Sequence, residues 1–262
     1  MTSPLFTAAN GMQVQQLNMN VIANNLANVN TTGFKSSRPE FQDLLYQNMR
    51  PAGANATTST EIPTGIQIGL GSRLAATIRQ HSQGSAQNTA QELDLMIEGA
   101  GFFEIELPDG TTAYTRAGSF SVDSTGRIVT VDGDPLTPAI TLPAEREEVI
   151  IGLDGTVSVR QTGSPTPTQV GTIQLVRFTN SPGLESIGHN LFRETETSGS
   201  PTRGTPNQDG YGRLAQGFLE LSNVDIVTEL VNMIVGQRAY EVNSKAIQAA
   251  DEMLQTANNV KR

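Results

Sequence analysis

Apolar residues recur at seven-residue spacing at both ends of this 262-residue chain, and this pattern constrains the fold most strongly. Near the N-terminus the first row holds Leu5, Met12, Met19 and Leu26, and the second holds Ala8, Gln15, Ile22 and Val29. A heptad period sustained in this way predicts a long amphipathic helix. Ser3 and Pro4 are typical of a helix start, and Gly33 of a helix stop. We therefore expect residues 1–34 to form a helical segment.

Residues 222–262 repeat the pattern. The main stripe holds Ile226, Leu230, Met233, Tyr240, Ile247 and Leu254, and a second stripe holds Val227, Val231, Ile234, Val235 and Val242. Ser222 and Asp225 have capping-box spacing, with Asp in place of the usual Glu or Gln. Because residues 223–260 contain one Gly and no Pro, we expect a single long helix there.

The middle of the chain has the pattern of a β domain. It contains Asp-Gly pairs, which favour tight turns, at 109–110, 132–133, 154–155 and 209–210. Short strand-like runs lie between them, at 103–107, 128–131, 149–151, 157–159 and 173–178. Residues 51–60, 162–168 and 197–208 have loop composition.

These patterns together predict an α+β fold. Long N- and C-terminal helices pack together as a coiled-coil-like assembly domain, and an intervening mainly antiparallel β domain lies between them in the sequence. We expect residues 1–34 and 222–262 to form a discontinuous helical domain. Residues 35–68 are an extended connector, and residues 69–221 are a β-rich outer domain.

Composition excludes several classes of protein. The net charge is −9, without a basic stripe, so nucleic acid is not an expected partner. No apolar run reaches the length needed to cross a bilayer, so membrane insertion is not expected. The chain has no Cys, which removes disulfides and thiolate chemistry. Its first charged residue is Lys35, so it has no ordinary secretory signal, which needs a basic N-terminal region.

The uncharged N-terminal helix indicates extensive contact with protein. Its polar positions are mostly Asn, Gln and small residues, and amides are far less costly to bury than unpaired charges. One interpretation is an antiparallel coiled coil between the two ends of one chain. The other adds packing between copies, because the C-terminal helix carries a second apolar stripe. A contact repeated from head to tail gives an open helical fibre unless the rotation closes.

Candidate chemistry is sparse, and we predict that the chain is not an enzyme and holds no cofactor or metal. Glu98, Glu104 and Glu106 are interpreted as solvent-facing strand carboxylates rather than a hydrolytic pair. The Asp132-Gly133-Asp134 run lacks the ligand pattern of a calcium loop. The run from Gly210 to Ala215 fits the dinucleotide-binding fingerprint only by letter.

Four other residues are interpreted as structural, surface or packing residues rather than as catalytic ones. We expect His81 and His189 to be surface or structural residues, and Arg116 to be a hydrogen-bonded structural residue. Tyr240 lies on the heptad stripe and is interpreted as a packing residue.

Several ordered motifs resemble those of the bacterial flagellar rod and hook family. They are Asn24-Asn25-Leu26-Ala27-Asn28, Thr32-Gly33-Phe34-Lys35, Glu98-Gly99-Ala100-Gly101-Phe102-Phe103, Tyr114-Thr115-Arg116-Ala117-Gly118-Ser119-Phe120, Ser222-Asn223-Val224-Asp225 and the run from Gln237 to Gln248. The resemblance covers nearly the whole chain. Within the family, the length and the segment from Tyr46 through Gln67-Ile68-Gly69 are most similar to distal rod members, with a proximal rod or hook-type paralogue as the alternative.

The resemblance implies a structural subunit of the basal-body drive shaft. Its terminal helices would form an inner tube around the export channel, and its β domain an outer layer. The implied partners are copies of the chain, proximal rod proteins, hook protein, the P- and L-ring proteins and the flagellar export apparatus. The implied location is the rod section that crosses the periplasm and peptidoglycan, reached without a cleavable signal peptide. The segment 46–68 resembles the stretch that makes a rod stiff.

Two interpretations from other classes remain open at this stage. One is a secreted adhesin or binding module, and the other is an enzyme that acts on peptidoglycan. Against both, we expect the packing residues of the terminal segments to carry the function through assembly. They are Leu5, Met12, Met19, Ile22, Leu26, Val29, Ile226, Leu230, Met233, Tyr240, Ile247 and Leu254.

Overall fold

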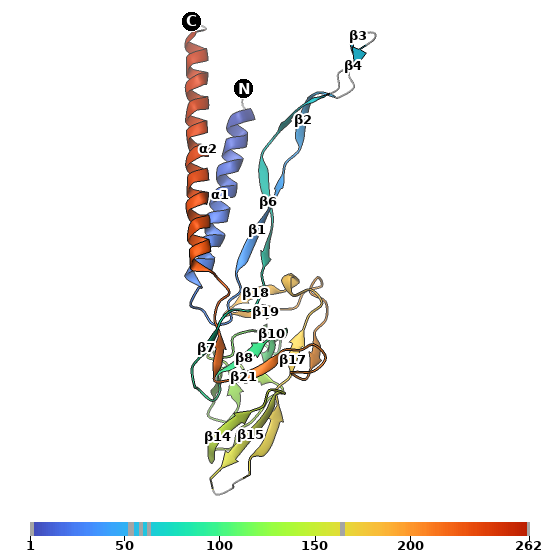
Figure 1. The fold of residues 1–262 in the computed structure, drawn as a ribbon, viewed down its shortest axis with the longest axis vertical. Coiled ribbons are helices and arrows are strands. Elements are labelled where there is room, and N and C mark those ends of the chain that lie inside the picture. Colours follow the sequence, from blue (N-terminus) through green and yellow to red (C-terminus); the bar gives the residue numbers. More distant parts are fainter. Residues whose placement is uncertain (1–2, 52–54, 58–59, 62–63, 163–165, 261–262) are drawn as a thin grey trace. The chain divides into compact units, whose positions relative to one another are not determined.

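The computed structural model describes residues 3–51, 55–57, 60–61, 64–162 and 166–260 (Figure 1). Its elements in chain order are α1 Ser3–Ala27, β1 Ser37–Asp43, β2 Tyr46–Arg50, β3 Asn55–Thr57, β4 Thr60–Glu61, β5 Ile66–Gly69, β6 Ser72–Arg79, β7 Ala86–Asn88, β8 Leu95–Glu98, β9 Phe103–Glu106, β10 Thr112–Thr115, β11 Ser121–Val122, β12 Ile128–Val129, β13 Leu136–Thr137, β14 Arg146–Ile151, β15 Thr156–Gln161, β16 Thr168–Thr172, β17 Leu175–Arg177, the short 3-10 helix η1 Ser181–Gly183, β18 Glu185–Gly188, β19 Leu191–Arg193, β20 Thr202–Gly204, β21 Arg213–Gln216, β22 Phe218–Glu220 and α2 Ile226–Val260. The predicted α+β class is confirmed, since the strand pairs of the β unit and the β2–β5 and β3–β4 pairs are antiparallel.

The chain divides into two compact units. The helical unit comprises Met1–Ala27, Ser37–Ile78 and Asp225–Arg262, and the β unit comprises Asn28–Ser36 and Arg79–Val224. The segment 35–68, expected as a connector, supplies one arm of a long β-ribbon (β1, β2 and β3) and much of the other (β4 and most of β5), which β6 completes. The segment forms paired strands rather than a single extended connector, because an extended segment satisfies its backbone hydrogen-bonding groups only beside a partner strand.

The first helix ends earlier than the sequence predicts. α1 stops at Ala27, not at Gly33, so Val29 lies outside it. The Thr31 amide donates to the Asn28 carbonyl at 3.2 Å, and the Thr31 hydroxyl donates to Asn28 Oδ1 at 3.2 Å. Asn and Thr side chains offer the backbone such local bonds, which compete with helix continuation. The predicted cap depends on the Ser3 side chain, which lies outside the described side chains.

The second helix begins at Ile226, three residues later than the sequence predicts, and its cap is Asp225 rather than Ser222. Asp225 Oδ1 accepts hydrogen bonds from the amides of Val227 at 2.9 Å and Thr228 at 3.1 Å. This satisfies amides that the first helical turn leaves without partners, and the carboxylate also complements the helix dipole.

The two helices pack against each other, as predicted, and run antiparallel within the helical unit (Figure 1). Gly11 of α1 lies beside Asn243 of α2, and Gly236 of α2 lies beside Met19. A Cβ at Gly11 would lie 2.9 Å from Asn243 Nδ2, which is too close for an ordinary contact. A Cβ at Gly236 would lie 3.4 Å from Met19 Cγ, an ordinary contact distance, so the tight approach of the two helices is at Gly11.

The β-ribbon forms the rest of the helical unit. β1 pairs with β6, β2 with β5, and β3 with β4. Strand β3 lies within residues 51–60, where the sequence predicted a loop, and β4 begins at the last of these residues. Asn10 Nδ2 of α1 donates to the Leu70 carbonyl at 3.3 Å, next to the bend between β5 and β6. α1 is thus held between α2 and the ribbon, in agreement with its lack of charge.

The β unit is organised around one apolar core. A five-stranded sheet has the order β13-β9-β10-β19-β18, and a three-stranded sheet has the order β14-β15-β16. The core members that are fully buried include Ile97, Phe103, Ile105, Val157 and Leu175. A smaller aromatic cluster contains Phe102, Tyr114, Phe178 and Phe192.

All four Asp-Gly pairs lie in turns, as predicted. Gly110 and Gly155 close the β9–β10 and β14–β15 hairpins, with amides donating to Leu107 and Gly152 at 2.9 and 3.0 Å. Asp109 and Asp154 each accept from the amide and hydroxyl of a Thr two residues later. These hydrogen bonds hold the pKa values of both carboxyl groups below their usual range.

Gly118 packs closely against the backbone of β8. A Cβ at Gly118 would lie 1.6 Å from the Leu95 carbonyl oxygen, and the Leu95 amide donates to the Gly118 carbonyl at 2.9 Å. We predict that Gly118→Ala lowers the free energy of unfolding by about 3 kcal/mol, the upper part of the range for overpacking, because rigid backbone must move. Urea denaturation monitored by circular dichroism measures this change.

Gly110→Ala is the matched control. Gly110, unlike Gly118, has a positive φ, and no atom lies within 4 Å of an added Cβ there. It should therefore lose only about 1 kcal/mol for the left-handed backbone. Equal losses for the two variants would contradict the packing argument.

Candidate functional site

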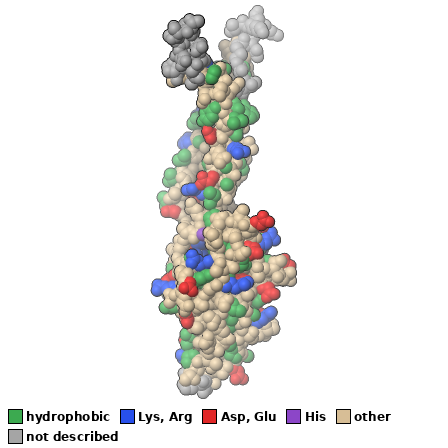
Figure 2. All heavy atoms as spheres, turned by 90° about the vertical axis from the view of Figure 1, so that its right-hand side faces the viewer, with side chains coloured by type: hydrophobic (Ala, Val, Ile, Leu, Met, Phe, Trp, Pro, Cys, Tyr) green, Lys and Arg blue, Asp and Glu red, His purple; other side chains and the backbone are tan. Residues whose placement is uncertain are grey.

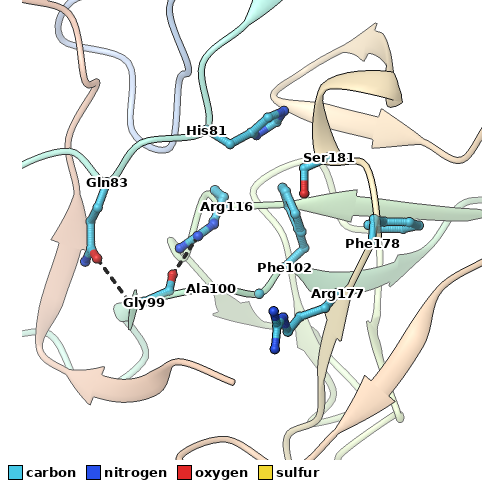
Figure 3. A pocket seen from close by; sticks show the side chains of 10 residues that line it. His81, Gln83, Gly99, Ala100, Phe102, Arg116, Arg177, Phe178 and Ser181 are labelled. Carbon is cyan, nitrogen blue, oxygen red and sulfur yellow. Dashed lines mark hydrogen bonds between the residues drawn. The ribbon is translucent and has the colours of Figure 1, made fainter. Parts of the chain in front are cut away.

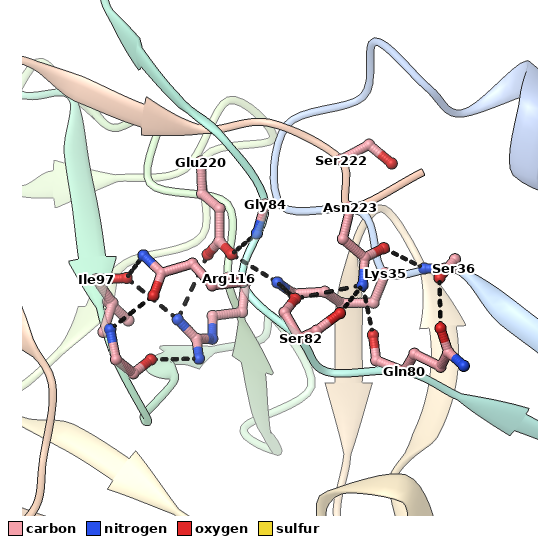
Figure 4. Close-up of polar contacts among 12 residues, drawn as sticks. Lys35, Ser36, Gln80, Ser82, Gly84, Ile97, Arg116, Glu220, Ser222 and Asn223 are labelled. Atoms are coloured by element: carbon pink, nitrogen blue, oxygen red, sulfur yellow. Dashed lines mark hydrogen bonds and ion pairs between the residues drawn. The ribbon is translucent and has the colours of Figure 1, made fainter. Parts of the chain in front are cut away.

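A buried charge cluster joins residues from three distant parts of the sequence in the β unit (Figure 4). Lys35 Nζ lies 2.6 Å from Glu220 Oε1, and both side chains have 0% exposure. Arg116 Nη1 lies 3.4 Å from Glu220 Oε2, with 4% exposure of the Arg116 side chain. Because removing charges from water is costly, such a cluster persists only when its remaining donors and acceptors are also satisfied.

Backbone groups complete most of these hydrogen bonds. Lys35 Nζ donates to the Ser82 carbonyl at 2.7 Å, and Arg116 Nη2 donates to the Gly99 carbonyl at 2.7 Å. Glu220 Oε1 also accepts from the Gly84 amide at 2.9 Å. Burial lowers the pKa of Lys35, and the Glu220 carboxylate opposes that shift. Arg116 is thus a hydrogen-bonded structural residue, as predicted.

Asn223 extends the polar network beside this cluster. Its Oδ1 accepts from the Ser36 amide at 2.7 Å, and its Nδ2 donates to the Gln80 carbonyl at 2.8 Å (Figure 4). The segments before β1, after β6 and before α2 are therefore tied together by one side chain. An apolar residue at 223 would leave two backbone groups to find other partners.

Asn25 has the equivalent role in the helical unit. Its side chain is 2% exposed. Its Nδ2 donates to the Ser37 carbonyl and to Glu229 Oε1, both at 2.9 Å, and its Oδ1 accepts from the Ser37 amide at 2.9 Å. One amide thus joins α1, β1 and α2, which requires a side chain with both donors and an acceptor.

The predicted packing residues divide into three groups by exposure. Ile22 is buried, and Leu5, Met12, Met19, Leu26, Val29, Met233, Ile247 and Leu254 are half-buried. Ile226, Leu230 and Tyr240 are exposed. Helix packing thus covers much of the first stripe of α1 and only part of the main stripe of α2. Their role in assembly stays a prediction.

A second set of apolar side chains on α2 is more exposed than the predicted stripe. Val227 is 71% exposed and Val242 is 65% exposed, and the other members are Val231, Ile234, Val235 and Met253. Figure 2 views the molecule from the side of the β-ribbon, where hydrophobic side chains lie between a few charged ones on the helical unit. We call these six residues, together with Ile226 and Leu230, the open face of α2. Exposed apolar side chains gathered on one helix are typical of an interaction site.

One prediction about the carboxylates is wrong. Glu104 is buried rather than solvent-facing, and Arg203 Nε and Nη2 each donate to one of its carboxylate oxygens at 2.7 Å. The bidentate pair compensates for burial of the charge and raises the pKa of Arg203. Glu98 pairs with Arg213, whereas Glu106 is exposed, as predicted.

The remaining candidates show no catalytic arrangement. His189 is exposed, and its Nδ1 lies 3.1 Å from Asp132 Oδ2. Gly210 lies in a turn that leads into strand β21 rather than a helix, so the dinucleotide fingerprint does not apply. The described residues contain no group of three His, Asp or Glu side chains placed to hold a metal ion. Neither helix, as far as it is described, is long and apolar enough to cross a membrane.

Two residues of these networks were missed by the sequence analysis. Asn25 lies inside a quoted motif, but nothing in its spacing distinguishes it from the neighbouring Asn24. Glu220 follows the apolar pair Phe218-Leu219 in a short strand, where an acidic residue is normally exposed. One sequence signal could have pointed to the buried cluster. The chain has no Lys between Lys35 and Lys245, so Lys35 is an isolated lysine.

The Lys35–Glu220 pair should contribute strongly to the stability of the chain. Glu220→Gln leaves Lys35 without its buried counter-charge, so the free energy of unfolding should fall by about 3–5 kcal/mol. Glu185→Gln is the control, because Glu185 pairs with Arg193 at an exposed site and should contribute less than about 1 kcal/mol. Urea denaturation of both variants measures the difference. A loss below 1 kcal/mol for Glu220→Gln would contradict the role of the cluster.

His81 should make the free energy of unfolding depend on pH. Burial, followed by the charges of Lys35, Arg116 and Arg79, lowers the pKa of His81 to about 4. Between pH 6.5 and 4 the unfolded chain therefore binds more protons at this residue, and stability falls as the pH falls through that window. The loss is at most about 3 kcal/mol, at about 1.4 kcal/mol per pKa unit. His81→Gln should remove this component; equal pH slopes for the variant and the parent chain, measured by urea denaturation, would contradict it.

Family models match three segments of the chain. Residues 5–35 match the model described as flagella basal body rod protein. Residues 96–159 match the flagellar hook protein FlgE/F/G D1 domain, and residues 215–260 match the flagellar basal body rod FlgEFG protein C-terminal model. These segments contain most of the quoted motifs.

Full-length relatives carry the same name. The chain is 52% identical over 264 residues to the flagellar basal-body rod protein FlgG of Borreliella burgdorferi, covering 100% of both chains. It is 49% identical to the protein of that name in Caulobacter vibrioides, covering 98% of each. It is 48% identical to that in Buchnera aphidicola, covering 97% of this chain and 98% of the relative. This family is structural, which confirms that the chain is not an enzyme. Its motifs, its two terminal helices and its full-length relatives show that the chain belongs to the flagellar basal-body rod family and is a structural subunit of the rod.

Proposed function

We propose that this subunit polymerises helically in the distal rod through the open face of α2. The observation that carries the proposal is the exposure of that face in the single chain. Fully burying a Val or Leu side chain stabilises a protein by about 1.5–3 kcal/mol, so a second copy that covers several of these side chains would offset much of the cost of association. The same contact repeated from copy to copy produces a helical polymer.

In the polymer the terminal helices form the inner layer as a coiled-coil-like assembly domain, and the β unit forms the outer layer. Packing helices along the shaft suits the transmission of torque from the motor to the hook, because close-packed side chains resist deformation. The inner layer encloses the export channel. The α1–α2 pair supports this proposal, since it supplies apolar side chains both between the two helices and on the open face.

The proposed partners follow the family. Copies of the chain form the polymer, proximal rod proteins and hook protein lie at its two ends, and the P- and L-ring proteins surround it as a bushing. The rod crosses the periplasm and the peptidoglycan layer. The flagellar export apparatus delivers the chain without cleavage of a signal peptide.

The β-ribbon is proposed to stiffen the polymer by contacting neighbouring copies. Its residues between β1 and β5 include Leu45 at 84% exposure, and also Tyr46, Met49 and Ile66, all exposed. A two-stranded ribbon is marginally stable by itself in water. A neighbouring copy that covers these side chains would stabilise the ribbon and limit bending between subunits.

Val231→Asp tests the open face of α2. Val231 is 53% exposed, so a carboxylate there should change the stability of the monomer by less than about 1 kcal/mol. Polymerisation should nevertheless be blocked, because the carboxylate would be buried without a partner in each repeat. Electron microscopy of rods and swimming assays of the complemented strain measure assembly.

Val131→Asp is the matched control for Val231→Asp. Val131 is 78% exposed and belongs to the β unit. It should therefore leave assembly unchanged. Normal rods with Val231→Asp would overturn the proposal. Leu26→Asp and Leu254→Asp, which affect half-buried residues of the helix pair, should also block growth while the β unit stays folded.

Deletion of residues 46–68 tests the ribbon. The proposal predicts that the shortened chain still assembles, because the helices are intact, but forms a bendable, hook-like polymer. The persistence length of isolated polymers in electron micrographs is the measurement. A polymer as straight as that of the full chain would refute the stiffening role.

A further inference from the structure

A cavity of about 320 Å³ lies in the β unit beside the buried charge cluster (Figure 3). Phe102 and Phe178 provide apolar walls, and Arg116, Arg177, His81 and Ser181 provide polar groups. A second cavity of about 410 Å³ shares Arg177 and Phe178 with it. Neither the family nor the assembly proposed above gives this cavity a function.

The wall of the cavity is positively charged. Lys35 and Arg116 share the carboxylate of Glu220, so the buried cluster keeps an excess of one positive charge. Arg116 Nε has no hydrogen-bond partner among the described residues, although the atom is buried. The residues that line the cavity include two arginines and no Asp or Glu, as far as the described chain shows. A negative group would compensate this charge.

Arg177 is the accessible cation of the cavity. Its Nη1 donates to the carbonyls of Gly210 at 3.1 Å and Asp209 at 3.5 Å, and its guanidinium lies over the Tyr211 ring. In the described residues it has no ion pair, whereas Arg193 and Arg213 of the same unit each pair with a glutamate. A guanidinium carries five N–H donors, so Arg177 retains donors for a carboxylate.

We propose that this cavity binds a carboxylate group of an Asp or Glu side chain from a second copy of the chain. Arg177 contacts the carboxylate, Arg116 supplies positive charge behind it, and Phe102 and Phe178 contact the aliphatic stem. Charge complementarity argues for a second copy, because the chain has 26 acidic residues against 17 Lys and Arg. The inference rests on self-assembly, but places a further contact in the β unit.

The first experiment uses propionate, which reproduces the end of a glutamate side chain. The full chain carrying Val231→Asp is used to keep it monomeric, and arginine Nε–Hε signals are followed by NMR. Propionate should shift the Arg116 and Arg177 signals in a saturable manner, whereas the neutral propionamide should not. Equal responses to the two compounds, or no response to propionate, would overturn the carboxylate site.

Variants then localise the binding. Arg177→Gln should weaken propionate binding at least tenfold, and Ala100→Leu should block the cavity, because Ala100 is exposed on its lining. Arg193→Gln is the control, since Arg193 is exposed in the same unit but does not line the cavity. If Ala100→Leu fails to fold, Arg177→Gln still decides the test. Unchanged affinity in Arg177→Gln would refute the assignment.

The second experiment identifies the occupant. Arg177→Gln, in the chain with Val231 intact, should assemble at least tenfold more slowly in light scattering than Arg193→Gln, and propionate should inhibit assembly of the parent chain. Propionate binding without any effect of Arg177→Gln on assembly would mean a free carboxylate ligand and would overturn the second-copy occupant. Normal assembly of Val231→Asp together with propionate binding would instead contradict only the open-face proposal.

Discussion

The buried pair between Lys35 and Glu220 is the interaction on which the β unit depends. Glu220 ends the strand that precedes α2, and Lys35 lies eight residues after the end of α1. Both charges are removed from water, so the chain must bring residues 35, 116 and 220 together with their backbone partners or leave a charge uncompensated. The large penalty for partial formation makes this cluster a strong determinant of one arrangement.

Asn25 and Asn223 apply the same principle with neutral groups. Each amide satisfies backbone or side-chain groups from segments that are distant in sequence, and neither needs a counter-charge. The Asn25 bonds to β1 and α2 explain how an uncharged N-terminal helix can contact both α2 and the β-ribbon. Buried amides still specify a geometry, because each unpaired hydrogen-bonding group would cost about 1–3 kcal/mol.

Sequence periodicity predicted the elements better than it predicted their ends or their polar contacts. Heptad spacing identified both helices, and the Asp-Gly pairs identified four turns, because both patterns are local. The end of α1 at Ala27 depends on hydrogen bonds of Asn28 and Thr31, and the start of α2 depends on the Asp225 cap. The burial of Glu104 could not be read from alternation, because it depends on Arg203, which is distant in sequence. The β-ribbon was likewise missed, because strand pairing depends on both partners.

Two surfaces of the single chain, the open face of α2 and the cavity at Arg177, differ in the kind of contact that they can make. The open face of α2 is apolar, and its burial is non-directional, so it can supply free energy of association without fixing one register. The cavity at Arg177 is small and charged, and a carboxylate that enters it must match both position and orientation. A polymer that repeats one subunit needs both properties. A register error between apolar helices changes the buried area little. A carboxylate placed beside an apolar wall instead of a guanidinium, in contrast, is strongly unfavourable. In the proposed polymer the β unit would therefore contribute to the accuracy of assembly, and the helices would contribute most of its strength.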